Sequence, residues 1–172
     1  MSVGTIVTIV LLMSVLVLGI FLIKNIFSSS KNAIDLTDKQ LTSEIEKLFS
    51  EESRLVIYPT SMLLKLKQEE AGAVGLGIKN LATSAGQGDT FSYEVVASEN
   101  NCGLSNSEIE EWIILGKSEE NIQITIGEME VARVTFQIPS GTPLCSARFR
   151  VNVYVEGDSY DTESFDVQVK AK

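Results

Sequence analysis

Residues 1–23 read MSVGTIVTIVLLMSVLVLGIFLI and contain no charged side chain. Fifteen of these 23 residues are Leu, Ile, Val or Phe, and the others are Met, Gly, Ser and Thr. A helix of about 20 consecutive apolar residues spans the roughly 30 Å hydrocarbon core of a bilayer. We therefore expect an apolar N-terminal helix that is buried in lipid, in protein, or in each of them at different times.

Three interpretations of this run compete. A cleaved secretory signal begins with basic residues and has an apolar stretch of only roughly 7–15 residues, whereas this run is longer and Lys24 follows it. The second interpretation is a permanent single-span membrane anchor. The third, which we favour because of the residues that follow the run, is the N-terminal helix of a filament subunit.

The segment after the run continues with apolar residues at helical spacing. Ile34, Leu41 and Leu48 are seven residues apart, and Ile45 lies between the last two, a spacing typical of one apolar helix face. No proline precedes Pro59. We therefore predict one continuous helix within residues 1–52, a rod of about 75 Å, and such a rod indicates a bundle with other copies of the chain.

A break near residues 28–37 is the alternative to a continuous helix. Ser28, Ser29 and Ser30 interrupt the apolar pattern, and Thr37 followed by Gln40 three residues later matches a capping box that opens a second helix. On this alternative the N-terminal segment forms two helices.

Residues 2–23, and Val3-Gly4-Thr5-Ile6-Val7 in particular, resemble the mature N-terminus of archaeal type IV pilins and archaellins. Bacterial type IV pilins carry Glu at the fifth mature position, where this chain has Thr5, and this difference favours the archaeal branch. The resemblance implies that a prepilin peptidase removed a leader before Met1. It also implies a precursor in the cytoplasmic membrane, an assembly machinery as partner and an extracellular filament as product.

In such a filament the N-terminal helices pack against one another, and small residues allow close approach. The expected helix contacts are Gly4, Thr5, Thr8, Leu12, Ser14, Leu16, Gly19, Phe21, Ile26, Phe27, Ile34, Leu41, Ile45 and Leu48.

In residues 53–172 the apolar residues recur at every second position, and no longer at the three- and four-residue spacing of a helix. Val74, Leu76 and Ile78 alternate with glycine and lysine, and further runs of this kind predict about eight short strands. We expect an immunoglobulin-like antiparallel β-sandwich. The predicted fold class is therefore α+β, with a long hydrophobic and amphipathic helix over residues 1–52 and a sandwich over residues 53–172. Residues 105–115 contain either a short helix or a strand.

Cys102 and Cys145 are the two cysteines of the chain, and they lie 43 positions apart. An even pair in an exported protein indicates a disulfide. The alternative is a pair of buried free thiols.

Composition excludes several functional classes. A net charge of −9 argues against nucleic acid as a partner. The chain has no histidine, which argues against the Ser-His-Asp and Cys-His nucleophile systems. Its two cysteines are too few for a zinc site made of thiolates alone. An acidic cluster lacks calcium-loop spacing and is interpreted as a polar hairpin tip; it contains Glu156, Asp158, Asp161 and Glu163. We expect no catalytic residues, metal or cofactor.

The function that these features predict is a structural one. We expect a subunit of an extracellular helical filament of identical copies, with helices in the core and β heads facing solvent for adhesion or motility. The alternative is a single-span anchored, immunoglobulin-like binding module that does not polymerise, resembling an archaellum stator component.

Overall fold

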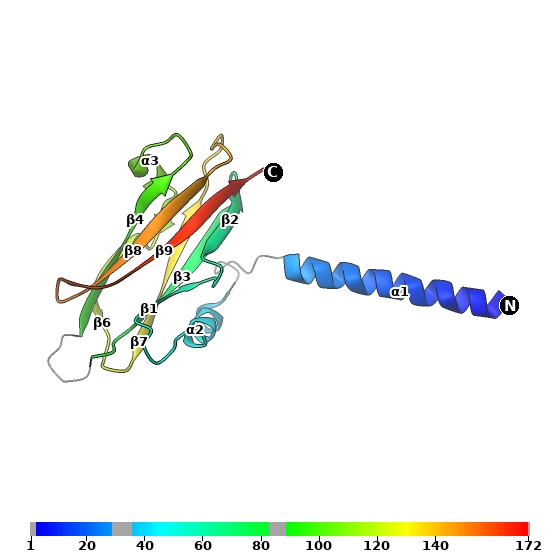
Figure 1. Ribbon diagram of the computed structural model, residues 1–172, viewed down its shortest axis with the longest axis horizontal. Helices are drawn as coiled ribbons and strands as arrows, with labels where there is room; N and C mark the ends of the chain where they lie inside the picture. The colour runs from blue at the N-terminus through cyan, green and yellow to red at the C-terminus, as the bar shows by residue number, and fades with distance from the viewer. Residues whose placement is uncertain (1–2, 29–35, 83–88, 172) are drawn as a thin grey trace. The chain divides into compact units, whose positions relative to one another are not determined.

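The computed structural model describes residues 3–28, 36–82 and 89–171 of the 172-residue chain (Figure 1). The chain divides into two compact units, Met1–Ser30 and Lys31–Lys172. The first unit contains helix α1 (Val3–Ser28). Within α1, the described side chains are those of Gly4, Thr5 and residues 7–18.

The second unit is built from two β-sheets. Sheet A contains, in spatial order, β1 (Leu55–Tyr58), β3 (Ala71–Lys79), β7 (Met129–Gln137) and β5 (Ile113–Leu115). Sheet B contains, in spatial order, β2 (Leu63–Lys67), β9 (Asp158–Lys170), β8 (Ser146–Val155), β4 (Thr90–Asn100) and β6 (Ser118–Gln123). Strands β2 and β9 are parallel, and the other described strand pairs are antiparallel.

The main core lies between the two sheets. Alternate residues of each strand point inward, as in β8, where Phe149 and Val151 are buried and Arg148 and Arg150 are exposed. Three phenylalanines from different strands meet there: the ring centroids of Phe136 and Phe149 are 5.0 Å apart, and those of Phe149 and Phe165 are 5.7 Å apart. This two-faced packing of antiparallel sheets is that of a β-sandwich, and the period of two in the sequence is its cause.

Residues 105–115 form both of the elements that the sequence left open. Helix α3 (Asn106–Glu110) begins at a capping box between Ser105 and Glu108, and the edge strand β5 follows it. Trp112, between these two elements, is 1% exposed and belongs to the main core.

Helix α2 (Asp38–Glu46) packs on the outer face of sheet A. Its apolar residues Leu41 and Ile45 form a second, smaller core with Tyr58 of β1 and Ala73 of β3. Strand β3 offers a flat surface here because it carries glycine on this face. A Cβ atom added at Gly75 would lie 2.6 Å from Leu41 Cδ1 and 2.9 Å from Ile45 Cδ1.

The predicted α+β class with a long N-terminal helix is wrong. The second unit is mostly β, helix α1 ends at Ser28, and the apolar side chains described in α1 extend only from Val7 to Leu18. The amphipathic segment forms the separate helix α2, which starts at the capping box: the Gln40 amide donates to Thr37 Oγ1 at 3.4 Å, and the Thr37 amide donates to Gln40 Oε1 at 3.0 Å. The capping box and the glycine surface of β3 are the physical reasons for the difference.

Candidate functional site

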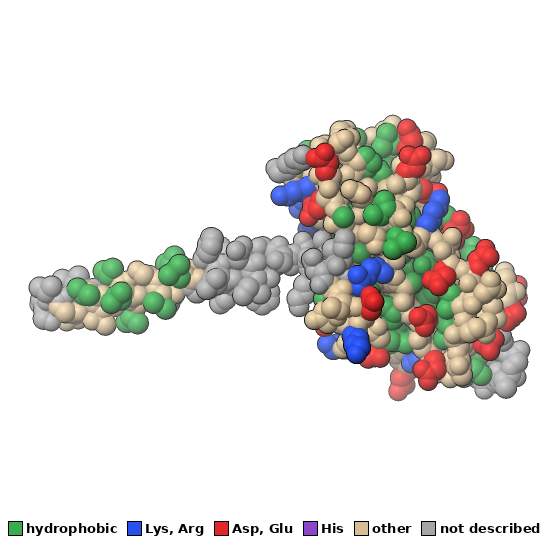
Figure 2. Space-filling model, turned by 180° about the vertical axis from the view of Figure 1, so that it is seen from behind, with side chains coloured by type: hydrophobic (Ala, Val, Ile, Leu, Met, Phe, Trp, Pro, Cys, Tyr) green, Lys and Arg blue, Asp and Glu red, His purple; other side chains and the backbone are tan. Residues whose placement is uncertain are grey.

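The described part of α1 is an apolar surface in every direction. The exposed fraction is 53% for Val7, 65% for Leu12 and 66% for Val15. Figure 2 shows hydrophobic side chains along this part of the helix. A helix that is apolar on all sides is buried in its working state, so this surface is the strongest candidate for an interaction site among the described residues.

Two hydroxyl side chains in the described part of this helix donate to its own backbone. The Thr8 hydroxyl donates to the Gly4 carbonyl at 2.7 Å, and the Ser14 hydroxyl donates to the Val10 carbonyl at 2.8 Å. Because an unpaired hydroxyl is costly in an apolar environment, these bonds make the whole surface compatible with a dry partner.

One side of α1 carries a shallow groove. The groove is lined by Ile9, Val10, Met13, Ser14, Val17 and Leu18. The short side chain of Ser14 leaves the space. At about 100° per residue, Leu12 and Val15 lie on the opposite side of the helix. Both sides carry branched side chains, and the side that contains Ser14 is shallowly hollowed.

The structure places the predicted helix contacts in three groups. Gly4, Thr5, Thr8, Leu12, Ser14 and Leu16 are exposed on α1. The side chains of Gly19, Phe21, Ile26, Phe27 and Ile34 lie outside the described part of the chain. Leu41 and Ile45 are 2% and 0% exposed, and Leu48 packs beside them, so the predicted amphipathic stripe faces its own sheet.

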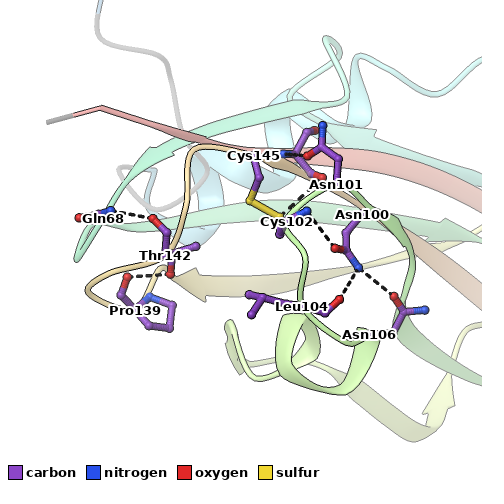
Figure 3. Close-up of a disulfide and its surroundings, with 10 residues drawn as sticks. Gln68, Asn100, Asn101, Cys102, Leu104, Asn106, Pro139, Thr142 and Cys145 are labelled. Atoms are coloured by element: carbon purple, nitrogen blue, oxygen red, sulfur yellow. Dashed lines mark hydrogen bonds between the residues drawn. A yellow bond between two sulfur atoms is a disulfide. The ribbon is translucent and has the colours of Figure 1, made fainter.

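The predicted disulfide is present at one end of the β4–β8 pair (Figure 3). Cys102 and Cys145 are bonded, with 5.0 Å between their Cα atoms. The loop around it is ordered by side-chain amides: Asn100 Nδ2 donates to the Leu104 carbonyl at 3.1 Å, and Asn101 Oδ1 accepts from the Ser146 amide at 2.7 Å. The bridge continues the strand pairing beyond its last residues and has the features of a structural cross-link.

A shallow hollow lies on the outer face of sheet B, around Arg148 and Arg150. The guanidinium of Arg148 is already engaged, since Nε and Nη2 donate to the two carboxylate oxygens of Asp166 at 2.9 and 3.2 Å. An exposed, salt-bridged pair of this kind contributes little energy and is no catalytic arrangement.

The described acidic side chains of the second unit form no group that could hold a metal ion. Partial burial tends to raise the pKa of Glu110, but hydrogen bonds from Lys117 and from the Ala97 amide outweigh it and lower that pKa. Over residues 3–28, 36–82 and 89–171, no three His, Cys, Asp or Glu side chains group around a possible metal position.

No helix in these same ranges combines the length and apolar character of a membrane span.

Sequence reasoning missed the docking surface of α2. Gly75 and Gly77 interrupt the apolar alternation of β3, and a glycine inside a strand often marks a close approach, so the signal was available. It also missed Arg133, whose Nη2 donates to the Leu36 carbonyl at 2.7 Å and to Asp38 Oδ1 at 3.1 Å. Nothing in the sequence indicated that these positions are close in space.

The comparisons with known proteins found likeness in structure alone. No family model and no curated protein matches the chain. A Niemann-Pick type C2 protein from the Japanese carpenter ant is 13% identical, with a TM-score of 0.40 over 69% of this chain and 90% of that one. A PapD-like domain of human CEP192 is 10% identical, with a TM-score of 0.39 over 72% of this chain and 89% of that one.

The expected membership of the archaeal type IV pilin and archaellin family is contradicted. No family model or curated protein supports it. Among the described residues, helix α1 ends at Ser28 and the separate helix α2 packs on sheet A, so they do not form the long apolar rod on which the resemblance depended. The small residues at the start of α1 are common to many apolar helices, and they do not distinguish this family from others.

Proposed function

We propose that this chain is a structural subunit of an extracellular helical filament, in which α1 packs against α1 of other copies and the β-sandwich faces solvent. The observation that carries the proposal is the surface of α1, where Val7, Leu12 and Val15 are each more than half exposed. Burying one such side chain contributes about 1.5–3 kcal/mol, so covering the helix on all sides is strongly favourable.

The distribution of this surface favours many copies over two. A dimer covers one side of a helix, whereas α1 is apolar on every described side. The groove at Ser14 and the branched side chains of Leu12 and Val15 lie on opposite sides. A contact of one with the other is heterologous, and a heterologous contact that does not close into a ring generates an open helical assembly.

The disulfide is consistent with the same function. Disulfides persist in oxidising compartments such as the cell exterior, and the chain has one between Cys102 and Cys145. The proposal places a stabilised β-sandwich outside the cell, where it determines the surface properties of the filament.

The test uses the full-length chain, transferred from detergent into buffer and examined by negative-stain electron microscopy. We expect filaments with a helical repeat. Ser14→Trp fills the groove and Leu12→Asp places a charge on the opposite side, so each variant alone should fail to form filaments. Ser14→Ala, which keeps the groove open, is the matched control and should assemble as the unmodified chain does.

An equimolar mixture of the Ser14→Trp and Leu12→Asp variants separates the two kinds of contact. If the contact is heterologous, the mixture retains one intact pairing and forms heterodimers, which light scattering measures. Monodisperse monomers of the unmodified chain that only insert into lipid vesicles would contradict the proposal and favour the anchored binding module.

A further inference from the structure

The outer face of sheet B carries a polar groove over its central strands β9, β8 and β4, which lie side by side (Figure 1). The polar groove consists of two adjoining hollows of about 450 and 270 Å³, which share Glu99, Arg148 and Asp166. The larger hollow also includes Arg150, and the smaller one includes Asn101. Sites for small molecules measure roughly 300–1,000 Å³, so the polar groove has the size of a binding site.

A β-bulge in strand β4 shapes the polar groove. The pairing of β4 with β8 shifts register between Ala97 and Glu99. Consecutive residues of a regular strand point to opposite faces, but here Ser98 and Glu99 both line the larger hollow. The Ala97 amide donates to Glu110 Oε1 at 3.0 Å, which holds the bulge from the side of helix α3. Bulges of this kind are frequent beside functional sites, where they redirect a side chain.

The polar groups of this groove are held in place by the protein itself. Arg148 is fixed by its two bonds to Asp166, at 2.9 and 3.2 Å, and the Ser98 hydroxyl donates to the Arg148 carbonyl at 3.2 Å. In the smaller hollow, Asn101 Oδ1 accepts from the Ser146 amide at 2.7 Å. Side chains that are already ordered lose less conformational entropy when a ligand binds.

Arg150 is a cation of the polar groove that has no ion pair. It is exposed and lies on the same face of β8 as Arg148. Its neighbours in the strand pairing are Val96 and Ser164, which carry no charge. The ion pairs formed by the described residues do not include it. Because a guanidinium presents a planar set of donors that matches a carboxylate, Arg150 offers a position for one.

The remaining lining selects the class of ligand. Most of the side chains carry hydroxyl, amide, carboxylate or guanidinium groups, so an apolar ligand finds little surface. A hydroxyl group both donates and accepts, and it can therefore donate to Glu99 or Asp166. A sulfate ion only accepts, and the same two carboxylates repel it. The lining thus fits a ligand that combines several hydroxyl groups with a carboxylate.

We propose that the polar groove binds an acidic saccharide, with the sugar carboxylate on Arg150 and ring hydroxyls on Glu99 and Asp166. The site lies within one sandwich, so the inference goes beyond the proposed filament and does not depend on it. A chain of net charge −9 repels anions over its surface as a whole. Recognition of the saccharide therefore comes from the local placement of these groups.

An array of oligosaccharides tests the ligand class. The full-length chain, kept in detergent, is applied to oligosaccharides that carry glucuronate, galacturonate or sialate, beside neutral oligosaccharides of equal length. We expect binding to at least one acidic saccharide and none to its neutral counterpart. Binding to no acidic saccharide, or equal binding to both kinds, would overturn the proposal. So would displacement of the saccharide by sulfate beyond that by chloride at equal ionic strength, because the groove would then be a simple anion site.

Substitution of Arg150 tests the position of the carboxylate. Arg150→Ala should lower the affinity for the bound saccharide on the order of tenfold or more, because charge-assisted hydrogen bonds are lost. Arg150→Lys should recover only part of it. Lys170→Ala is the matched control, since Lys170 is exposed on the same sheet outside the groove, and it should retain the affinity. Calorimetric titration measures these values, and equal losses in the alanine variants would refute the assignment.

Two further measurements separate this site from folding and from the filament. Arg150→Ala should keep the urea midpoint of the unmodified chain, because Arg150 is exposed, and it should form the same filaments. Saccharide binding by a chain that forms no filaments refutes only the proposed function. Filaments of a chain that binds no acidic saccharide refute only the polar groove as a binding site.

Discussion

Helices α1 and α2 are both apolar, but their apolar side chains end in opposite environments. In α2, Ile45 is 0% exposed, whereas Leu12 in α1 is 65% exposed. The apolar residues of α2 lie on one face, and the glycine surface of β3 receives that face. The described residues of α1 are apolar on all sides, and one flat surface cannot cover such a helix.

The difference shows that an apolar stripe does not identify its own partner. The seven-residue spacing of Leu41 and Leu48 is compatible with a sister helix or with a sheet. The partner of the stripe is decided by the surface on which it can pack, and Gly75 and Gly77 provide that surface within the same chain. An interface between copies therefore cannot be assigned from helix periodicity alone.

A charge placed in each helix should separate their roles most strongly. Ile45→Asp buries an unpaired carboxylate against sheet A and should lower the free energy of unfolding by about 4–5 kcal/mol. Leu12→Asp should leave it unchanged and abolish self-association. Urea unfolding followed by fluorescence of Trp112, the single tryptophan, measures the first quantity. Equal destabilisation by both variants would contradict the contrast.

Removal of the disulfide should act on the sandwich and not on α1. Replacing Cys102 and Cys145 with alanine opens a loop defined by a separation of 43 residues and should cost about 4 kcal/mol by the chain-entropy relation. The midpoint of urea unfolding gives this value. Association of the folded chain through α1 should be unaffected at low temperature, and a loss of association without a loss of stability would argue against the assignment.

The glycine surface under α2 should tolerate no added methyl group. Gly75→Ala should destabilise the second unit by about 1–3 kcal/mol because the new Cβ meets Leu41 and Ile45. A double-mutant cycle with Leu41→Ala measures the coupling, and the double variant should cost less than the sum of the two single variants. Additive costs would mean that α2 does not rest on this surface.

Alkaline pH should weaken the sandwich and leave α1 unaffected. Burial, with a smaller contribution from Glu119, raises the pKa of Tyr93 to about 12 from 10.0. The folded chain therefore holds the phenol proton more tightly than the unfolded chain does. The stabilisation is complete below pH 10 and is lost as the pH rises towards 12. Tyr93→Phe should reduce this decline in the pH profile of unfolding, and the remainder should come from Tyr58, whose pKa is also raised by burial and by Glu44. Residues 3–23 of α1 contain no charged side chain that would respond.

Much of the sandwich could be predicted from the sequence, because the alternation of residues along a strand indicates which of its faces is buried. Val74, Leu76 and Ile78 alternate with Gly75 and Gly77, and the structure puts the first set in the main core. The prediction of one long helix was wrong because the spacing of apolar residues indicates which face of a helix is apolar but not which surface covers that face. The polar groove was not predictable, because only the pairing of β4, β8 and β9 brings its residues together.

The sequence by itself determined the local features: the apolar helix α1, the capping box at Thr37 and the strand alternation. Each of these depends on residues that are neighbours along the chain, so their physics is local. Only the tertiary structure decided that α2 packs on sheet A, that Arg133 holds the Leu36 carbonyl, and that Glu99 and Asp166 lie on either side of Arg148. These outcomes depend on segments far apart in sequence, which meet only when the sheets form.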